Sequence, residues 1–168
     1  SPIMLITALL IKLTAPGPLI YKQERVGLHN QTFMMYKFRS MEVQDPKKEK
    51  KGWTVKNDPR VTPIGKIIRK TSIDELPQLL NVLKGEMSLV GPRPPLPEEE
   101  ERYTDYERQR LSVTPGLTCY WQVSGRSNTS FEQWVELDLK YIQERNLFID
   151  IKLIFKTFFV LFGSDDAY

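Results

Sequence analysis

The stretch TSIDELPQLLNVLKGEMSLVGPRPP, residues 71–95, contains signals for a helix start, an amphipathic helix, a helix stop, a short buried strand and a rigid turn. Four leucines have the i, i+3, i+4, i+7 spacing that predicts a core-facing helix stripe: Leu76, Leu79, Leu80 and Leu83. Gly85 follows as the expected C-terminal stop. Helix formation alone does not explain the adjacent carboxylates Asp74 and Glu75, nor Arg93 between two prolines.

Helix capping is one explanation of the acidic pair. Ser72 and Glu75 have the S-x-x-E spacing of a capping box. Alternatively, Asp74 is the N-cap and Pro77 lies in the first turn, where its missing N–H costs nothing. In both cases the helix dipole favours acidic residues at this position.

Basic residues beside glycine and proline turns suggest a second explanation. The candidates are Arg25, Lys37, Arg39, Arg69, Arg93 and Arg126, and most of them lie next to glycine or proline turns rather than on regular charged helix faces. Guanidinium groups bind phosphate in a bidentate manner, and a helix N-terminus offers free N–H groups to an anion. Two adjacent carboxylates would repel a bare phosphate, so they fit if one is a nucleophile or if Mg²⁺ bridges both to a diphosphate.

Composition excludes several other classes of protein. The chain has 168 residues, of which 40% are hydrophobic and 27% charged, which suits one domain with a core. A net charge of +3 gives no indication of nucleic-acid binding. One cysteine, Cys119, excludes an internal disulfide and favours a core position. There is no P-loop and no G-x-G-x-x-G motif, and the only histidine, His29, lies in a turn-like stretch.

Both ends of the chain are strongly apolar. Residues 2–13 would form a helix of about 18 Å, shorter than a hydrocarbon core of about 30 Å. Residues 150–163 are apolar except for Asp150, Thr157 and the lysines Lys152 and Lys156, which lie four residues apart. This pattern fits a helix in a membrane interface, and core helices at both ends are the alternative.

The remaining segments predict a mixed α+β fold with short strands. A Pro-Gly-Pro turn and then a short strand are expected in residues 16–27, and a second strand in residues 31–41. Residues 58–70 are expected to contain turns and a short helical piece. Residues 44–58 form a lysine-rich loop, and residues 98–111 a charged, solvated helix. Ser130 and Gln133 have capping-box spacing for a further helix.

Four blocks of this sequence, in order, strongly resemble the bacterial sugar transferases, the monotopic polyprenyl-phosphate phosphoglycosyl transferases. The blocks are GPLIYKQERVG (17–27), FMMYKFRSM (33–41), DPRVTPIGKIIRKTSIDELPQLLNVLKGEMSLVGPRP (58–94) and TPGLTCYWQVSGRS (114–127). The resemblance implies transfer of a sugar-1-phosphate from a UDP-sugar to undecaprenyl phosphate, with release of UMP. Such reactions begin the assembly of exopolysaccharide, capsule, O-antigen or glycoconjugates.

The resemblance also implies roles for individual residues. Asp74 matches the family's nucleophile, which forms a covalent phosphoglycosyl intermediate, and Glu75 assists it through Mg²⁺ or proton handling. Arg69 and Arg93 match arginines that neutralise phosphate charge. The substrate-binding set is completed by residues of two further blocks: Lys37 and Arg39, and Gln122 and Arg126 near the donor nucleotide.

Family architecture implies one catalytic domain over residues 1–168, belonging to a longer chain. Residues 1–13 would be the second half of a re-entrant membrane helix that breaks at Pro2, residues 14–149 the catalytic core, and residues 150–162 a membrane-interface helix. The expected location is the cytoplasmic face of the bacterial inner membrane. A homo-oligomer is left open.

Two alternatives remain. The first is a non-enzymatic membrane-peripheral module that binds anionic lipid or protein through its amphipathic ends and its basic loop at residues 47–56. The second is a glycosyltransferase that moves the sugar alone and releases UDP. The nucleotide product distinguishes this last reaction from phosphosugar transfer.

Overall fold

The computed structural model describes residues 2–43, 58–124 and 130–163. They form two compact units. The first comprises residues 2–21, 37–43 and 58–77, and the second residues 22–36, 78–124 and 130–163. Both units are small, and the expected mixture of helices and short strands is confirmed.

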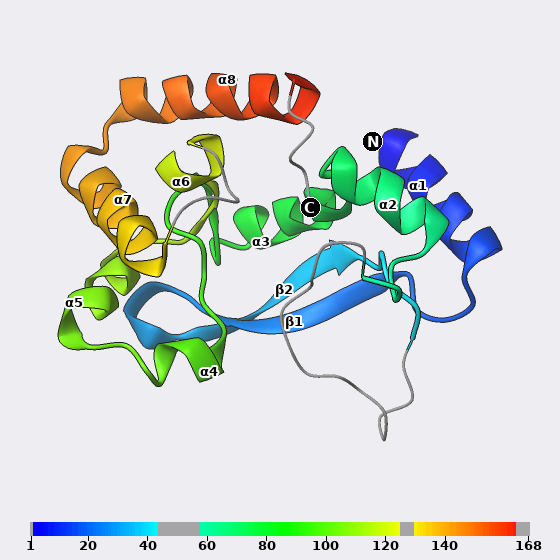
Figure 1. Ribbon diagram of the computed structural model, residues 1–168, viewed down its shortest axis with the longest axis horizontal. Helices are drawn as coiled ribbons and strands as arrows, with labels where there is room; N and C mark the ends of the chain where they lie inside the picture. The colour runs from blue at the N-terminus through cyan, green and yellow to red at the C-terminus, as the bar shows by residue number, and fades with distance from the viewer. Residues whose placement is uncertain (1, 44–57, 125–129, 164–168) are drawn as a thin grey trace. The chain divides into compact units, whose positions relative to one another are not determined.

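The first unit is built on two helices, α1 (Pro2–Thr14) and α2 (Pro63–Lys70), which lie side by side in Figure 1. Its buried core consists of Ile11, Phe38 and Ile68. The Thr62 side chain caps α2 by accepting a hydrogen bond of 3.0 Å from the Gly65 N–H. A β-carbon on Gly65 would collide with the Ser40 carbonyl, so this close approach requires glycine.

A two-stranded sheet of β1 (Ile20–Val26) and β2 (Thr32–Phe38) contributes residues to both units. The connection contains the 3₁₀ turn η1 (Leu28–Asn30), where exposed His29 has a left-handed φ of 52°. Both strands agree with the expected ones.

The second unit contains a parallel pair of strands, β3 (Ser88–Val90) and β4 (Gly116–Thr118), with Ser88 opposite Gly116. Its helices are α3 (Leu79–Leu83), α4 (Pro97–Glu100), α5 (Asp105–Arg108), η3 (Gln109–Ser112), α6 (Tyr120–Val123), α7 (Phe131–Glu144) and α8 (Leu147–Gly163). In Figure 1, α6 lies beside both α7 and α8. The core cluster consists of Val90, Cys119, Tyr141 and Leu153, which confirms Cys119 as a core residue.

The predicted leucine stripe of residues 76–83 is wrong. Leu79, Leu80 and Leu83 are exposed, Leu83 to 83%. The buried side chain of α3 is Asn81, which donates to the Met34 carbonyl and to Glu86 and accepts from the Tyr36 N–H. These bonds to the hairpin turn the polar side of the helix inward.

The predicted charged helix over residues 98–111 is also wrong in part. It is broken into α4, α5 and η3, and Arg110 and Leu111 near its end are buried. By contrast, the predicted capping box of α7 is confirmed, because the Ser130 side chain accepts from the Gln133 N–H at 3.3 Å. Gly85 ends α3 with a positive φ of 77°, as predicted.

The two terminal helices leave most of their apolar side chains exposed. Thr7 and Ile11 are the buried residues of α1, and Leu153 is buried on α8. Helix α8 begins at Leu147 rather than at residue 150. Pro2, Lys152 and Lys156 are exposed, as a membrane-facing role would need. None of the helices formed by the described residues combines the length and apolar character needed to cross a bilayer.

Candidate active site

The acidic pair lies in a 3₁₀ helix, η2 (Ile73–Gln78), and neither predicted cap forms as expected. Ser72 has a left-handed φ of 52°, whereas an N-cap residue takes an extended backbone. Asp74 is inside the helix rather than before it. Pro77 has no N–H to donate to a preceding turn, so a regular α-helix begins only at Leu79.

Asp74 is 92% buried. Burial, and next the charge of Glu75, raise the pKa of the Asp74 carboxyl to about 6, although Lys37 and Arg69 act in the opposite direction. The carboxylate is therefore more basic than an ordinary aspartate and still mostly ionised above neutral pH. This combination suits a nucleophile.

Lys37 binds Glu75 directly. The Lys37 Nζ donates to Glu75 Oε1 over 2.7 Å, from the end of β2 to η2. The Glu75 side chain is 40% exposed and that of Lys37 21%. The first unit therefore brings Asp74, Glu75 and Lys37 together, with Arg69 close enough to influence Asp74 electrostatically.

Arg39, for which a phosphate contact was predicted, binds backbone carbonyls within the first unit. It is buried, and its guanidinium donates to the carbonyls of Pro16 at 2.8 Å and Ala15 at 2.6 Å. These bonds anchor the chain just after α1. We therefore assign Arg39 a structural role within the first unit.

The acidic pair offers the ligand type that Mg²⁺ prefers, carboxylate oxygen. Among the described residues there is no group of three or more His, Cys, Asp or Glu side chains that could hold a metal ion. Mg²⁺ commonly uses only one or two protein carboxylates and takes its other ligands from water and substrate phosphates. Asp74 and Glu75 fit that mode of binding, with Glu75 partly open to solvent.

Arg93 lies in the second unit, on the turn after β3. Its guanidinium carbon is 5.8 Å from the centre of the Trp121 ring. No carboxylate pairs with Arg93 within the described part of the chain, so its positive charge is available to an anionic ligand. Gln122 is buried on α6, and Arg126 lies outside the described residues.

Arg25, another basic candidate, is also buried. Its Nη1 donates to the Pro94 carbonyl at 3.0 Å and its Nη2 to Gln23 Oε1 at 2.8 Å. Sequence analysis missed a similar residue, Arg110, which forms a buried ion pair with Asp138 at 2.7 Å. The position of Asp138 on the apolar side of α7, between Val135 and Tyr141, was the available signal.

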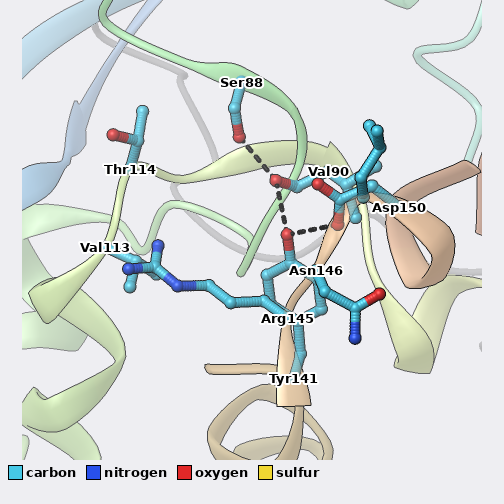
Figure 2. A pocket seen from close by; sticks show the side chains of 9 residues that line it. Ser88, Val90, Val113, Thr114, Tyr141, Arg145, Asn146 and Asp150 are labelled. Atoms are coloured by element: carbon cyan, nitrogen blue, oxygen red, sulfur yellow. Dashed lines mark hydrogen bonds between the residues drawn. The ribbon is translucent and has the colours of Figure 1, made fainter. Parts of the chain in front are cut away.

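A pocket of about 350 Å³ in the second unit contains none of the predicted site residues. Figure 2 shows the side chains that line it, among which the Tyr141 hydroxyl lies 2.8 Å from Asp150 Oδ1 and 3.2 Å from the Val90 carbonyl. Ser88 Oγ donates to the same carbonyl at 2.6 Å. These polar groups satisfy one another, so we assign the pocket no catalytic role.

Comparisons with known proteins agree with the motifs. The family model described as "Bacterial sugar transferase" matches residues 1–164. The galactosyl transferase CpsE of Streptococcus agalactiae serotype III is 51% identical over 161 residues, covering 88% of this chain and 36% of that protein. The undecaprenyl-phosphate galactose phosphotransferase of Salmonella typhimurium is 47% identical over 166 residues, covering 90% and 35%.

A third relative is the UDP-glucose:undecaprenyl-phosphate glucose-1-phosphate transferase of Escherichia coli, 43% identical over 176 residues, covering 100% of this chain and 38% of that protein. The chain thus spans little more than a third of the length of these relatives. Since the family model covers nearly all of the chain and the relatives are similar throughout it, this chain belongs to the bacterial sugar transferase family.

Proposed function

We propose that this chain is the catalytic part of a phosphoglycosyl transferase, which moves a sugar-1-phosphate from a UDP-sugar to undecaprenyl phosphate. The names of two relatives, an undecaprenyl-phosphate galactose phosphotransferase and a glucose-1-phosphate transferase, support this reaction class. The observation that carries the proposal is Asp74, a buried carboxylate of raised pKa beside the Glu75–Lys37 pair.

In the first step, an Asp74 carboxylate oxygen attacks the phosphorus that bears the sugar. A bond forms between Asp74 and this phosphorus, and the bond from phosphorus to the bridging oxygen of UMP breaks. UMP leaves with the electron pair, and the phosphosugar remains on Asp74. Nucleophilic catalysis divides one difficult transfer into two easier ones in this way.

In the second step, an oxygen of undecaprenyl phosphate attacks the same phosphorus. The Asp74 carboxylate is released unchanged, and the product is undecaprenyl-diphospho-sugar. A carboxylate with a pKa of about 6 is basic enough to attack and acidic enough to leave.

Glu75 and Lys37 control the charge around this nucleophile. Lys37 fixes one Glu75 oxygen by its bond of 2.7 Å, and its positive charge keeps the pKa of Asp74 from rising further. Mg²⁺ held by the two carboxylates and the donor diphosphate would offset the negative charge of the phosphates. In the first unit Arg69 would add positive charge beside Asp74, and in the second unit Arg93 is a candidate for a phosphate contact.

We assign this activity to a membrane surface at the cytoplasmic face, where both the lipid acceptor and a nucleotide sugar are accessible. The exposed apolar side chains of α1 and α8 support this assignment. On α8 they include Phe148, Phe155 and Phe159, with exposures of 84%, 63% and 71%. Burying such surface in a bilayer interface is favourable, and Lys152 and Lys156 can extend toward headgroups.

The identity of the released nucleotide tests the proposal. The chain is mixed with Mg²⁺, undecaprenyl phosphate in detergent and a panel of UDP-sugars, with Asp74→Asn as the matched control. UMP from one or two donors, absent with the variant, is the expected result. Release of UDP would instead indicate transfer of the sugar alone. Vesicle binding by both proteins without any nucleotide release would favour the non-enzymatic membrane module.

A further inference from the structure

The turn that carries Arg93 is held at every carbonyl. Residues 92–95 have the sequence Pro-Arg-Pro-Pro, so three of the four have no N–H with which to stabilise the turn locally. All four carbonyls nevertheless accept a hydrogen bond from another segment of the second unit. The donors are the Gly116 N–H at 3.0 Å, Arg110 Nη2 at 3.3 Å, Arg25 Nη1 at 3.0 Å and the Val26 N–H at 3.0 Å, in chain order.

Two of these donors are buried guanidinium groups, and removing their charge from water carries a free-energy cost. Arg25 is 5% exposed and Arg110 2%. Burying a charge is unfavourable unless it is paired and hydrogen-bonded. Arg110 meets this requirement through Asp138, to which it donates from Nε at 2.9 Å and with which Nη2 forms the 2.7 Å ion pair. It also donates from Nη1 to the Tyr103 hydroxyl at 2.8 Å.

The Arg93 side chain is also connected to Arg110, through two tryptophan rings. Its guanidinium lies over the Trp121 ring, and Trp121 contacts Trp134 with ring centres 4.9 Å apart. The Arg110 guanidinium lies over the second ring of this pair, with its carbon 4.6 Å from the centre of the Trp134 ring. Backbone and side chain of Arg93 are thus both connected to Arg110, one by a hydrogen bond and the other through two aromatic rings.

The strand beneath the turn adds to its rigidity. A β-carbon on Gly116 would collide with the backbone of Val90 and Gly91, so β4 can approach the start of the turn only because residue 116 is glycine. Proline, close strand contact and four external hydrogen bonds together leave residues 92–95 little freedom.

We propose that Arg25 and Arg110 are positioning residues, which fix the turn of residues 92–95 so that the Arg93 guanidinium is presented in one place to a phosphate group of the donor. This inference rests on the proposed function, because the ligand is the diphosphate of the nucleotide sugar. Neither buried arginine touches that ligand. Each acts only through Arg93.

A double-mutant cycle on Arg25 and Arg93 tests the proposal. Arg93→Ala lowers kcat/KM for the donor by about 100-fold, the usual scale for a lost charge-assisted contact. Arg25→Gln lowers it by about tenfold when Arg93 is present, because a displaced guanidinium stabilises the reacting phosphate poorly. In the Arg93→Ala background the same change has an effect of less than about twofold. Arg108→Gln, an exposed arginine of α5 paired with Glu100, is the control and leaves the rate unchanged.

Two outcomes overturn the proposal. Equal losses from Arg25→Gln in both backgrounds mean that Arg25 supports folding alone, and an unaffected Arg93→Ala variant means that Arg93 binds no ligand. Unfolding midpoints of all variants are measured beside the rates. If Arg25→Gln does not fold, Arg25→Lys takes its place in the cycle, since lysine keeps the charge but lacks the planar guanidinium fork.

A second readout separates this proposal from the proposed function. The four proteins of the cycle are titrated with UDP, a diphosphate probe that needs no turnover. The expected result is the same non-additivity in UDP affinity. Non-additive UDP binding without UMP release would remove the proposed reaction and leave the positioning role. UMP release, together with additive losses in both kcat/KM and UDP affinity, would support the proposed reaction and remove the positioning role.

Discussion

Asp74 is a carboxylate in a place that favours its protonated form, since it is buried and adjacent to another carboxylate. Lys37 and Arg69 supply the opposing positive charge that keeps its pKa near 6. The basicity of the Asp74 carboxylate is therefore adjusted by neighbours within one short stretch of the first unit and by one lysine from β2.

This environment predicts the pH dependence of the reaction. In the proposed reaction only the ionised carboxylate attacks, so the rate should fall as pH decreases through about 6, the pKa of Asp74. Lys37 lowers that pKa, so Lys37→Met should move the acid limb of the profile to higher pH. Glu75 raises it, so Glu75→Gln should move the limb to lower pH. Initial rates of UMP release between about pH 5 and 8 measure all three profiles.

Lys66→Met is a suitable control, because this lysine of α2 is exposed, whereas Lys37 lies against Glu75. Shifts of the same sign in Lys37→Met and Glu75→Gln would contradict the electrostatic account. A profile of the parent chain with no acid limb near pH 6 would also contradict it.

At the scale of elements, helix α3 shows why a hydrophobic pattern can mislead. The leucine spacing is regular, but the segment begins in a 3₁₀ turn and its α-helical part has only five residues. In so short an element, the three hydrogen-bonding partners of Asn81 outweigh the apolar stripe.

Stability measurements can separate the two faces of α3. Asn81→Ala leaves the Tyr36 N–H and the Met34 carbonyl without their partner and should cost about 2–3 kcal/mol in the free energy of unfolding. Leu83→Ser, on the exposed face, should change it by less than about 0.5 kcal/mol. Urea denaturation of both variants provides the comparison. A larger loss in Leu83→Ser than in Asn81→Ala would restore the predicted core stripe.

Sequence patterns predicted the locally encoded elements well. The strands beside the proline-glycine turns, the capped helix α7 and the Gly85 stop depend on residues near in sequence, and all are present. The buried roles of Arg25, Arg39 and Arg110 were not predicted, because each arginine binds a backbone carbonyl that lies 17 to 69 residues away along the chain. A guanidinium beside a turn looks the same in sequence whether it binds phosphate or the turn's own backbone.

For the candidate site, too, features encoded by neighbouring residues were predicted, whereas contacts between residues distant in sequence were not. Adjacent carboxylates at a helix start and an arginine between prolines made Asp74, Glu75 and Arg93 candidates from residue type and spacing. Residue type could not reveal that Lys37 pairs with Glu75, a partner 38 positions away, or that Trp121 lies under Arg93.

Both terminal helices of the molecule expose apolar side chains, which we propose contact a membrane surface. Phe155→Ser and Phe159→Ser should each weaken binding to anionic lipid vesicles by about tenfold, since each removes a large apolar side chain from the interface. The unfolding midpoint should not fall, because both rings are exposed in the protein. Vesicle co-sedimentation gives the affinities, and Leu83→Ser serves as an exposed apolar control on another helix.

Unchanged vesicle binding in both phenylalanine variants would remove α8 from the membrane surface. An equal loss in Leu83→Ser would mean that exposed apolar surface binds lipid regardless of its place in the fold.

If Asp74 carries the phosphosugar between donor and acceptor, the covalent intermediate should be detectable by intact-protein mass measurement. The chain and its Asp74→Asn variant are each incubated with Mg²⁺ and the UDP-sugar in the absence of undecaprenyl phosphate. The reactions are quenched, and the masses of the two intact proteins are compared. We expect a mass gain of one sugar phosphate, located at Asp74 by peptide mapping, with a burst of UMP no larger than the amount of protein. We also expect added undecaprenyl phosphate to remove the adduct. UMP formation in undiminished amount by Asp74→Asn, with no adduct on either protein, would contradict the account.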